Sequence, residues 1–192
     1  DAKPGNSIAV EIGAYYTTTF KTAKISSLSL GATITNIGAK LSYTDNQNKD
    51  FLPTNLRLGG AYTTELDPYN SITFVLDFNK LLVPTPPIRA TDGTIIYGKD
   101  DNRSLLSGMF GSFTDAPNGF EEEIQEIMTS IGVEYWYNDI FAARLGYFNE
   151  SKNKGNRKYM TLGLGFRKKA FGIDVAYLVP VNQRESPLAE TL

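Results

Sequence analysis

The sequence predicts an all-β protein, a transmembrane antiparallel up-and-down β-barrel, and three patterns carry this prediction. Apolar side chains alternate with polar or small ones in eight segments, the period of a β-strand. The connections between these segments alternate between short and long, as in outer-membrane barrels. The polar face holds glycines and single charges, whereas the apolar face holds large aliphatic and aromatic residues.

Composition limits the classes of function. The 192 residues are 41% hydrophobic and 21% charged, with a net charge of -2, which fits one folded domain. The chain has neither Cys nor His, so the usual ligands for zinc, redox chemistry and nucleophilic catalysis are missing. We therefore expect no enzymatic activity and no cofactor. Without a basic excess, nucleic acid is not an expected partner.

The membrane prediction rests on strands. The sequence contains no apolar run of about 18 residues, so it predicts no transmembrane helix. A transmembrane strand needs only about 10 alternating residues, half of which face a polar lumen. No signal peptide is visible at the first residue, Asp1.

Four strands are predicted before a long excursion, residues 81–128. They cover residues 7–19, 28–35, 55–66 and 71–80. Ile72, Phe74 and Leu76 illustrate the apolar face of the last one. Residues 36–38 interrupt the pattern, the polar stretch 41–53 predicts a surface loop, and Asp67-Pro68-Tyr69-Asn70 predicts a tight turn.

Four more strands are predicted after the excursion. They cover residues 129–138, 141–147, 160–166 and 173–179, with short turns at 138–139 and 168–169 and loops at 150–156 and 180–187. If Tyr137 lies opposite Phe141, the same register places Glu134 opposite Arg144 on the polar face. We expect an ion pair there, facing a lumen and contributing roughly 0.2 to 1 kcal/mol.

The distribution of charge favours a barrel over a soluble β-sandwich. A sandwich buries its large residues and covers its outer faces with charged ones. Here isolated charges lie on the small-residue face, at Glu11, Arg57, Asp77, Glu134, Arg144 and Asp174. Aromatic residues suited to interfacial girdles are Tyr16, Tyr62, Tyr135, Tyr137, Tyr147 and Phe166. Aromatic residues also favour strands in general, so a soluble sandwich remains the alternative.

The last loop leads toward a further strand, and lipid does not tolerate an open sheet edge. We therefore expect residues 1–192 to form one partial barrel domain, belonging to a larger barrel with an even number of strands. Residues 81–128 are expected to be an extracellular insertion with short helices.

The excursion holds the candidate partner-binding residues. Pro84, Pro86 and Pro87 predict either a polyproline recognition site or a stiff exit from the strand. Phe110, Phe113 and Phe120 offer apolar side chains that could anchor a partner or pack on the barrel rim.

The end of the excursion has a helical pattern. Asn118 followed by Glu121 predicts a helix start, and Phe120, Ile124, Ile127 and Met128 share one face. The helix would serve as a lid or docking element, or would pack over the barrel mouth. Its acids, Glu121, Glu122, Glu123 and Glu126, do not predict a calcium site, because adjacent helical acids diverge and no ligand-spaced loop follows. No metal site is therefore expected.

Several separated strings resemble one protein family. They are Asn55-Leu56-Arg57-Leu58-Gly59, Thr63-Thr64-Glu65-Leu66-Asp67, Ile72-Thr73-Phe74, residues 79–87 (Asn-Lys-Leu-Leu-Val-Pro-Thr-Pro-Pro), Phe113-Thr114-Asp115-Ala116-Pro117, Glu134-Tyr135-Trp136-Tyr137 and residues 153–159 (Asn-Lys-Gly-Asn-Arg-Lys-Tyr). Spread over nearly the whole chain, they resemble the PorV family of outer-membrane proteins of the Bacteroidetes type IX secretion system.

The resemblance implies a FadL-like barrel of about 14 strands, of which this chain would cover roughly the C-terminal half. It also implies binding of secreted cargo through C-terminal signal domains. The cargo would come from the secretion translocon and pass to a surface attachment complex that includes the PorU sortase. The alternative function is a FadL-type channel for hydrophobic small molecules. Either function implies the outer membrane of a Gram-negative bacterium, contact with its lipid, and extracellular long loops.

Overall fold

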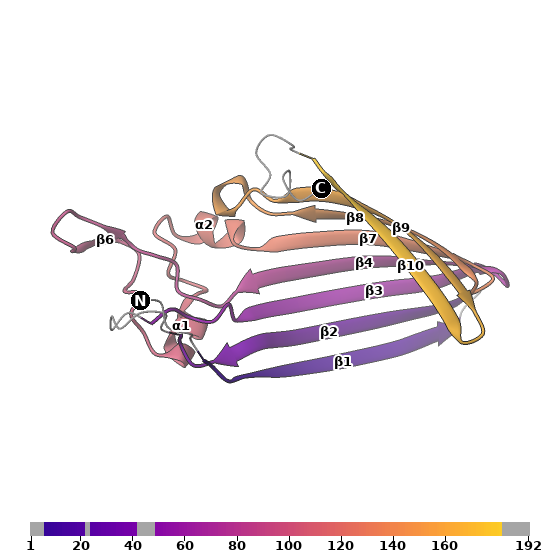
Figure 1. Cartoon of the computed structure of the whole chain (residues 1–192), viewed down its shortest axis with the longest axis horizontal. Coiled ribbons are helices and arrows are strands. Elements are labelled where there is room, and N and C mark those ends of the chain that lie inside the picture. Colours follow the sequence, from indigo (N-terminus) through magenta and orange to yellow (C-terminus); the bar gives the residue numbers. More distant parts are fainter. Residues whose placement is uncertain (1–5, 22–23, 42–48, 182–192) are drawn as a thin grey trace. The chain divides into compact units, whose positions relative to one another are not determined.

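The computed structural model describes residues 6–21, 24–41 and 49–181, and within them the fold is mostly β. Eight strands form one sheet in the order β1-β2-β3-β4-β7-β8-β9-β10 (Figure 1). The strands before the excursion are β1 Ala9–Lys21, β2 Ile25–Gly38, β3 Asn55–Asp67 and β4 Asn70–Leu81. Those after it are β7 Met128–Tyr137, β8 Phe141–Asn149, β9 Lys158–Lys168 and β10 Phe171–Pro180. The predicted antiparallel sheet is confirmed.

The strands match the predicted segments, with longer ends. β2 continues to Gly38, so the interruption predicted at residues 36–38 is wrong. Asn36 does adopt a left-handed backbone conformation, with φ 59°, which asparagine tolerates better than most residues. The Thr54 hydroxyl donates a hydrogen bond to the Asn36 carbonyl over 2.8 Å and holds this end of the strand. The loop predicted at 180–187 lies mostly outside the described residues.

The register beyond the excursion is the predicted one. Tyr137 pairs with Phe141, and Glu134 pairs with Arg144. Asn138 and Asp139 both have φ 53°, the paired left-handed conformation of a tight hairpin turn. The Ile140 N–H donates to the Tyr137 carbonyl over 3.0 Å and closes this turn.

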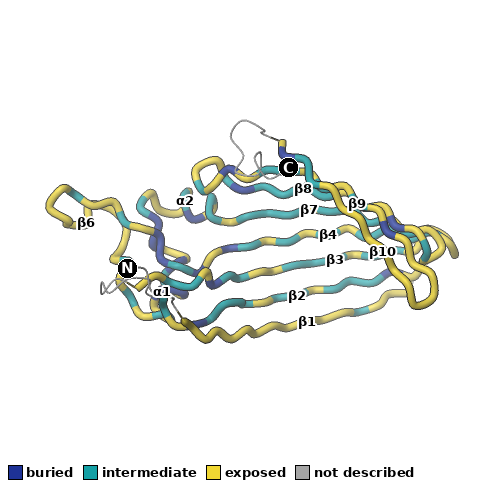
Figure 2. Tube along the Cα trace, viewed as in Figure 1, coloured by how far each residue is buried: buried dark blue, intermediate teal, exposed yellow. Residues whose placement is uncertain are grey.

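The apolar face of these strands is not covered by other described parts of the chain. Phe141, Leu145 and Leu164 are 54%, 47% and 68% exposed, whereas Ala142, on the opposite face, is 4% exposed (Figure 2). Neither helix in the described part of the chain has the length and hydrophobicity needed to span a membrane.

Residues 81–128 contain more structure than the sequence predicts. A two-stranded sheet pairs β5, Ile88–Arg89, with β6, Ile95–Tyr97, and two short helices follow: α1, Leu105–Gly111, and α2, Phe120–Gln125. The small sheet and α1 were not located from the sequence. The helix predicted over 120–128 is shorter, because β7 begins at Met128. A 3-10 turn, Lys152–Lys154, lies between β8 and β9.

The chain divides into two compact units. One consists of Asp1–Ala14, Ala32–Arg57 and Asn79–Ile127, and the other of Tyr15–Gly31, Leu58–Phe78 and Met128–Leu192. In the first unit, which contains the excursion, buried apolar residues include Leu82, Pro84, Met109 and Ala116, all within the excursion (Figure 2). The excursion therefore has a small core of its own.

Candidate functional site

The excursion is fastened to the end of β4 by a buried lysine. Lys80 Nζ lies 3.0 Å from Oε2 of Glu123 and 2.6 Å from Oε2 of Glu126. The side chains of Lys80 and Glu123 are 7% and 8% exposed. Buried ions are tolerated only where partners and hydrogen bonds replace the lost water. This ion cluster therefore ties α2 and the residue after it to the strand.

A backbone N–H and a side-chain hydroxyl donate further hydrogen bonds to these carboxylates. The Ala116 N–H donates to Glu123 Oε1 over 2.9 Å, and the Thr85 hydroxyl donates to Glu126 Oε1 over 2.7 Å. Hydrogen bonds to a carboxylate offset the cost of removing it from water. The two acids thus join the start and the middle of the excursion to its end.

Asp115 is a second buried acid in the same region. Its side chain is completely buried, and its Oδ2 lies 3.5 Å from Arg103 Nη1. The Thr85 N–H donates to its other oxygen over 3.4 Å. Burial raises the pKa of Asp115, against the opposing effects of the Thr85 N–H and the Arg103 charge. The negative charge of Glu123 adds to the increase.

Helix α2 packs against the rest of its unit through its acidic side. Phe120 and Ile124 are 77% and 53% exposed, whereas Glu123 is 7% exposed. Pairing with Lys80 turns the acidic side of the helix inward and leaves these apolar side chains exposed. Glu123 and Glu126 are three residues apart and so share a face, which is the signal that could have indicated their common partner.

The predicted start of this helix also needs correction. Gly119, with φ 70°, is the N-cap residue and supplies no side-chain hydrogen bond. Asn118 lies one residue earlier and instead donates its N–H and its side-chain amide to Glu122 Oε2, over 2.9 and 3.1 Å. A carboxylate within the first turn thus replaces the expected cap.

The candidate partner-binding residues differ in accessibility. Phe110, Phe113 and Phe120 are 74%, 45% and 77% exposed. Pro86 is exposed and Pro87 half-buried, but Pro84 is buried. Pro84 therefore belongs to the excursion's interior and does not present its ring to a partner.

The β5–β6 hairpin projects away from α1 and α2 (Figure 1). It exposes Ile96 and Tyr97, which are 53% and 60% accessible. Arg89 fixes its base through a 2.7 Å contact between Nη2 and Oδ1 of Asp101. The excursion thus presents two groups of exposed large side chains, one on its helices and one on this hairpin.

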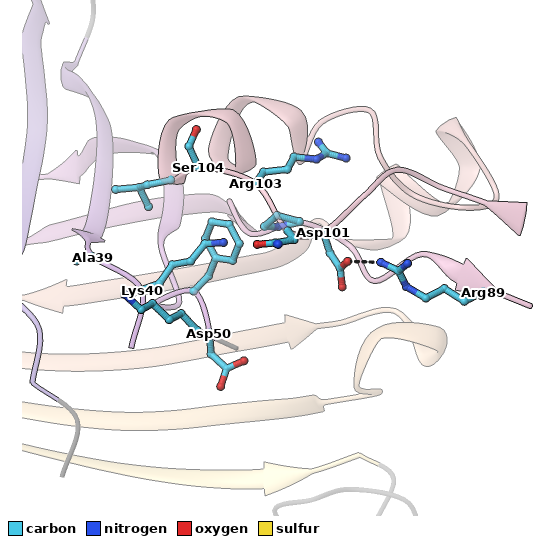
Figure 3. A pocket seen from close by; sticks show the side chains of 12 residues that line it. Ala39, Lys40, Asp50, Arg89, Asp101, Arg103 and Ser104 are labelled. Carbon is cyan, nitrogen blue, oxygen red and sulfur yellow. Dashed lines mark hydrogen bonds and ion pairs between the residues drawn. The ribbon is translucent and has the colours of Figure 1, made fainter. Parts of the chain in front are cut away.

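A pocket of about 800 Å³ opens beside α1 (Figure 3). One side comes from Ala39, Lys40, Lys49, Asp50 and Phe51, and the other from Pro84, Arg89, Asp101, Asn102, Arg103, Ser104 and Leu105. All of these residues belong to the unit that contains the excursion. No sequence pattern indicated this pocket, because it joins the end of β2 to a helix more than sixty residues away in the chain.

In the other unit, the structure brings Glu134 and Arg144 together. Arg144 Nε lies 2.5 Å from Glu134 Oε2, and Arg144 Nη1 lies 2.5 Å from Asp174 Oδ1. Arg144 thus links β7 and β10 across β9. The glycines of β9 leave room for this crossing, since a Cβ on Gly165 would lie 2.9 Å from Arg144 Nη1. That these charges face a lumen stays a prediction.

The same side of this unit carries the single tryptophan, Trp136. The guanidinium carbons of Arg144 and Arg167 lie 5.5 and 4.7 Å from its ring. Cations over an aromatic face are attracted by the quadrupole of the ring. The fluorescence of Trp136 is therefore a natural reporter of the Arg144 network.

Comparison with known families finds one match, over part of the chain. Residues 1–88 match the PorV family, described as type IX secretion system protein PorV. The predicted resemblance is confirmed over this range, which spans β1 to β4 and the first residues of the excursion. The matched range is less than half of the 192 residues, and the family it matches is named for the type IX secretion system. No curated protein matches the chain.

Proposed function

We propose that the chain is part of a closed outer-membrane barrel that receives secreted proteins through their C-terminal signal domains. The cargo arrives from the translocon and is passed to a surface attachment complex containing the PorU sortase. The excursion, residues 81–128, lies outside the cell and serves as the docking surface. The PorV match of residues 1–88 supports the secretion system, and the geometry of the excursion supports the docking role.

One observation carries the docking role. The excursion exposes large apolar side chains although it has a core and a buried ion cluster that hold it in place. Phe110 and Phe120, on α1 and at the start of α2, are 74% and 77% exposed. Aromatic residues on a preorganised surface are the usual anchors of protein interfaces, because little conformational entropy is lost when a partner covers them.

Three basic side chains of the excursion and its base are paired with acids, which suits a surface that must remain folded in water. Lys80, Arg89 and Arg103 each have a carboxylate partner within the excursion. The sheet does not need the excursion for its backbone hydrogen bonds, since β4 pairs directly with β7. Residues 84–119 can therefore be replaced without opening the sheet.

The test replaces residues 84–119 by a short Gly/Ser linker in a bacterium that secretes by the type IX route. We expect a heat-resistant, membrane-inserted barrel that no longer co-purifies with cargo or translocon components. The point-variant version is Phe110→Ser with Phe120→Ser, which should weaken cargo co-purification. Phe171→Ser is the matched control, because Phe171 is equally exposed, at 81%, but lies at a turn in the other unit.

Normal secretion and normal cargo capture by the linker variant would remove the excursion from the docking role. Co-purification of hydrophobic small molecules, with no cargo bound to the unmodified protein, would favour the FadL-type channel instead. Recovery of a stable protein from the soluble fraction without detergent would contradict the membrane barrel itself.

A further inference from the structure

We propose that the pocket beside α1 binds a phosphate group carried by a saccharide, with Lys40 and Lys49 as the phosphate ligands. The inference does not depend on the docking role of the excursion. Three observations support it: the arginines of the pocket have carboxylate partners whereas the lysines form no salt bridge with a described residue, the pocket is large enough for a small molecule, and α1 holds the wall in place.

An isolated β-bridge joins the two segments that carry the lysines. The N–H of Leu41 donates to the Asp50 carbonyl over 2.8 Å, and the N–H of Asp50 donates back over 2.7 Å. Lys40, Lys49, Asp50 and Phe51 all line the pocket at this bridge. Figure 3 shows the Asp50 carboxylate directed away from the Lys40 ammonium. Asp50 therefore does not neutralise Lys40.

The other cations of the pocket already have carboxylate partners. Arg89 Nη2 lies 2.7 Å from Asp101 Oδ1, and Arg103 Nη1 lies 3.5 Å from Asp115 Oδ2. By contrast, no carboxylate among residues 6–21, 24–41 and 49–181 forms a salt bridge with Lys40 or Lys49. The lysines are thus the positive groups of the pocket that a ligand can neutralise.

Two ammonium groups on one face suit a phosphate. A lysine acts as a compact point charge with three donors and accepts tetrahedral oxyanions, whereas planar carboxylates are matched best by the arginine fork. Lys40 Nζ also lies 4.0 Å from the centroid of the Phe51 ring, which restricts the ammonium to the pocket wall. The charge is thus partly preorganised before a ligand arrives.

The pocket is larger than a phosphate ion requires. Its volume of about 800 Å³ is in the range of sites for whole small molecules. Asp101, Asn102 and Ser104 line the wall opposite the lysines and offer carboxylate, amide and hydroxyl groups. Such groups pair with the hydroxyls of a sugar. A phosphorylated saccharide fills both parts of the pocket, whether it is free or is the headgroup of a glycolipid.

The wall that carries the lysines is held rigidly by α1. A Cβ on Gly108 would lie 2.7 Å from Cε1 of Phe51 and 3.1 Å from Cγ of Pro84, so the helix contacts both residues closely at this glycine. Gly108 is buried and its N–H donates to the Ser104 carbonyl over 2.8 Å. Gly108→Leu should therefore displace Phe51 and, with it, the ammonium of Lys40.

The test titrates the detergent-solubilised full-length protein by calorimetry with glucose 1-phosphate, glucose, lipopolysaccharide micelles and the same lipopolysaccharide after removal of its phosphates. We expect binding of a phosphorylated probe but not of its phosphate-free counterpart, and weaker binding as salt increases. Binding of glucose 1-phosphate indicates a free sugar phosphate as a source, and binding of lipopolysaccharide alone indicates a lipid headgroup. Lys40→Gln with Lys49→Gln should weaken binding at least about tenfold, the loss expected when charge-assisted hydrogen bonds are removed.

Lys152→Gln is the matched control, since Lys152 is an exposed lysine in the other unit. Its affinity should equal that of the unmodified chain. No binding of any phosphorylated probe by the unmodified chain would overturn the proposal. Equal affinity of the double lysine variant and the control, or equal binding of phosphorylated and phosphate-free probes, would overturn it as well. Electrophoretic heat modifiability checks that each variant is folded.

Discussion

Lys80 Nζ lies 3.0 Å from Oε2 of Glu123, and both side chains are almost fully buried. We predict that Lys80→Met loosens the excursion, because it leaves the carboxylates of Glu123 and Glu126 buried without their cation. Breaking a buried ion pair on one side costs about 3 to 5 kcal/mol. Limited proteolysis and amide exchange should show faster opening of residues 81–128, while the strands stay protected.

A compensating variant separates charge from packing. Lys80→Met combined with Glu123→Gln and Glu126→Gln removes all three charges and retains acceptors for Ala116 and Thr85. Protection of the excursion should return toward that of the unmodified chain. If the triple variant opens as easily as the single one, the ion cluster is not what holds the excursion.

The second prediction concerns the crossing of β9 by Arg144. A Cβ on Gly165 would lie 2.7 Å from Asp174 Oδ1 and 2.9 Å from Arg144 Nη1. Gly165→Val should therefore separate this ion pair and destabilise the sheet by about 1 to 3 kcal/mol, the usual cost of overpacking. Urea unfolding followed by Trp136 fluorescence measures the loss, and the native emission should shift because Arg144 lies over that ring.

Gly31→Val is the matched control, since Gly31 is also a strand glycine but a Cβ there meets nothing within 4 Å. Its unfolding midpoint should change little. Equal losses at Gly31 and Gly165 would assign the effect to strand glycines in general and not to the Arg144 crossing.

The third prediction is a pH dependence at the loop between β8 and β9. Arg157 donates to Glu150 through Nε, over 2.7 Å, and through Nη2, over 2.8 Å. Burial alone would raise the pKa of Glu150, but the hydrogen bonds and charge of Arg157 outweigh it and hold that pKa below its usual value of 4.5. The stability from this pair is thus present above the unfolded-state pKa and is lost as pH falls through the folded-state pKa.

Glu150→Gln should remove this pH-dependent part. The free energy of unfolding of the unmodified chain should exceed that of the variant at pH 7, and the difference should shrink below about pH 4.5. Buried Asp115 has a raised pKa and acts in the opposite direction, but it is common to both proteins and cancels in the difference. A constant difference from pH 7 to pH 3 would contradict the assigned role of Glu150.

The strands and their register were predictable because the alternation of apolar with polar or small residues along the sequence indicates which face of each strand is apolar. The pairing of Tyr137 with Phe141 followed from a short turn, and it fixed Glu134 opposite Arg144. A period of two leaves no freedom once one pair is set. The ion pair between Arg144 and Asp174 was not predicted. It depends on the glycines of β9, which have no side chain to block the Arg144 guanidinium, and not on a charge pattern within one hairpin.

The excursion was harder to predict because its structure depends on contacts distant in sequence. Lys80 turns the acidic side of α2 inward, and Phe51 packs against Gly108 across more than fifty residues. Helices as short as α1 and α2 have too few turns for a strong periodic signal. Local patterns therefore gave the existence of helical structure but neither its bounds nor its buried side.

The last prediction concerns the orientation of the proposed barrel in the outer membrane. Outer-membrane barrels have short turns on the periplasmic side and long loops outside. The chain has no cysteine, so single cysteines give an unambiguous signal. Asn118, Asn153 and Lys168 are all exposed, which makes each suitable for labelling with a membrane-impermeant maleimide.

Asn118→Cys, in the excursion, and Asn153→Cys, between β8 and β9, should label on intact cells. Lys168→Cys, at the end of β9, should label only after the outer membrane is permeabilised. Permeabilised cells provide the control that every site is reactive. Because both loops are long and the turn after β9 is short, the reverse pattern would show that the excursion faces the periplasm, where it could not receive cargo at the cell surface.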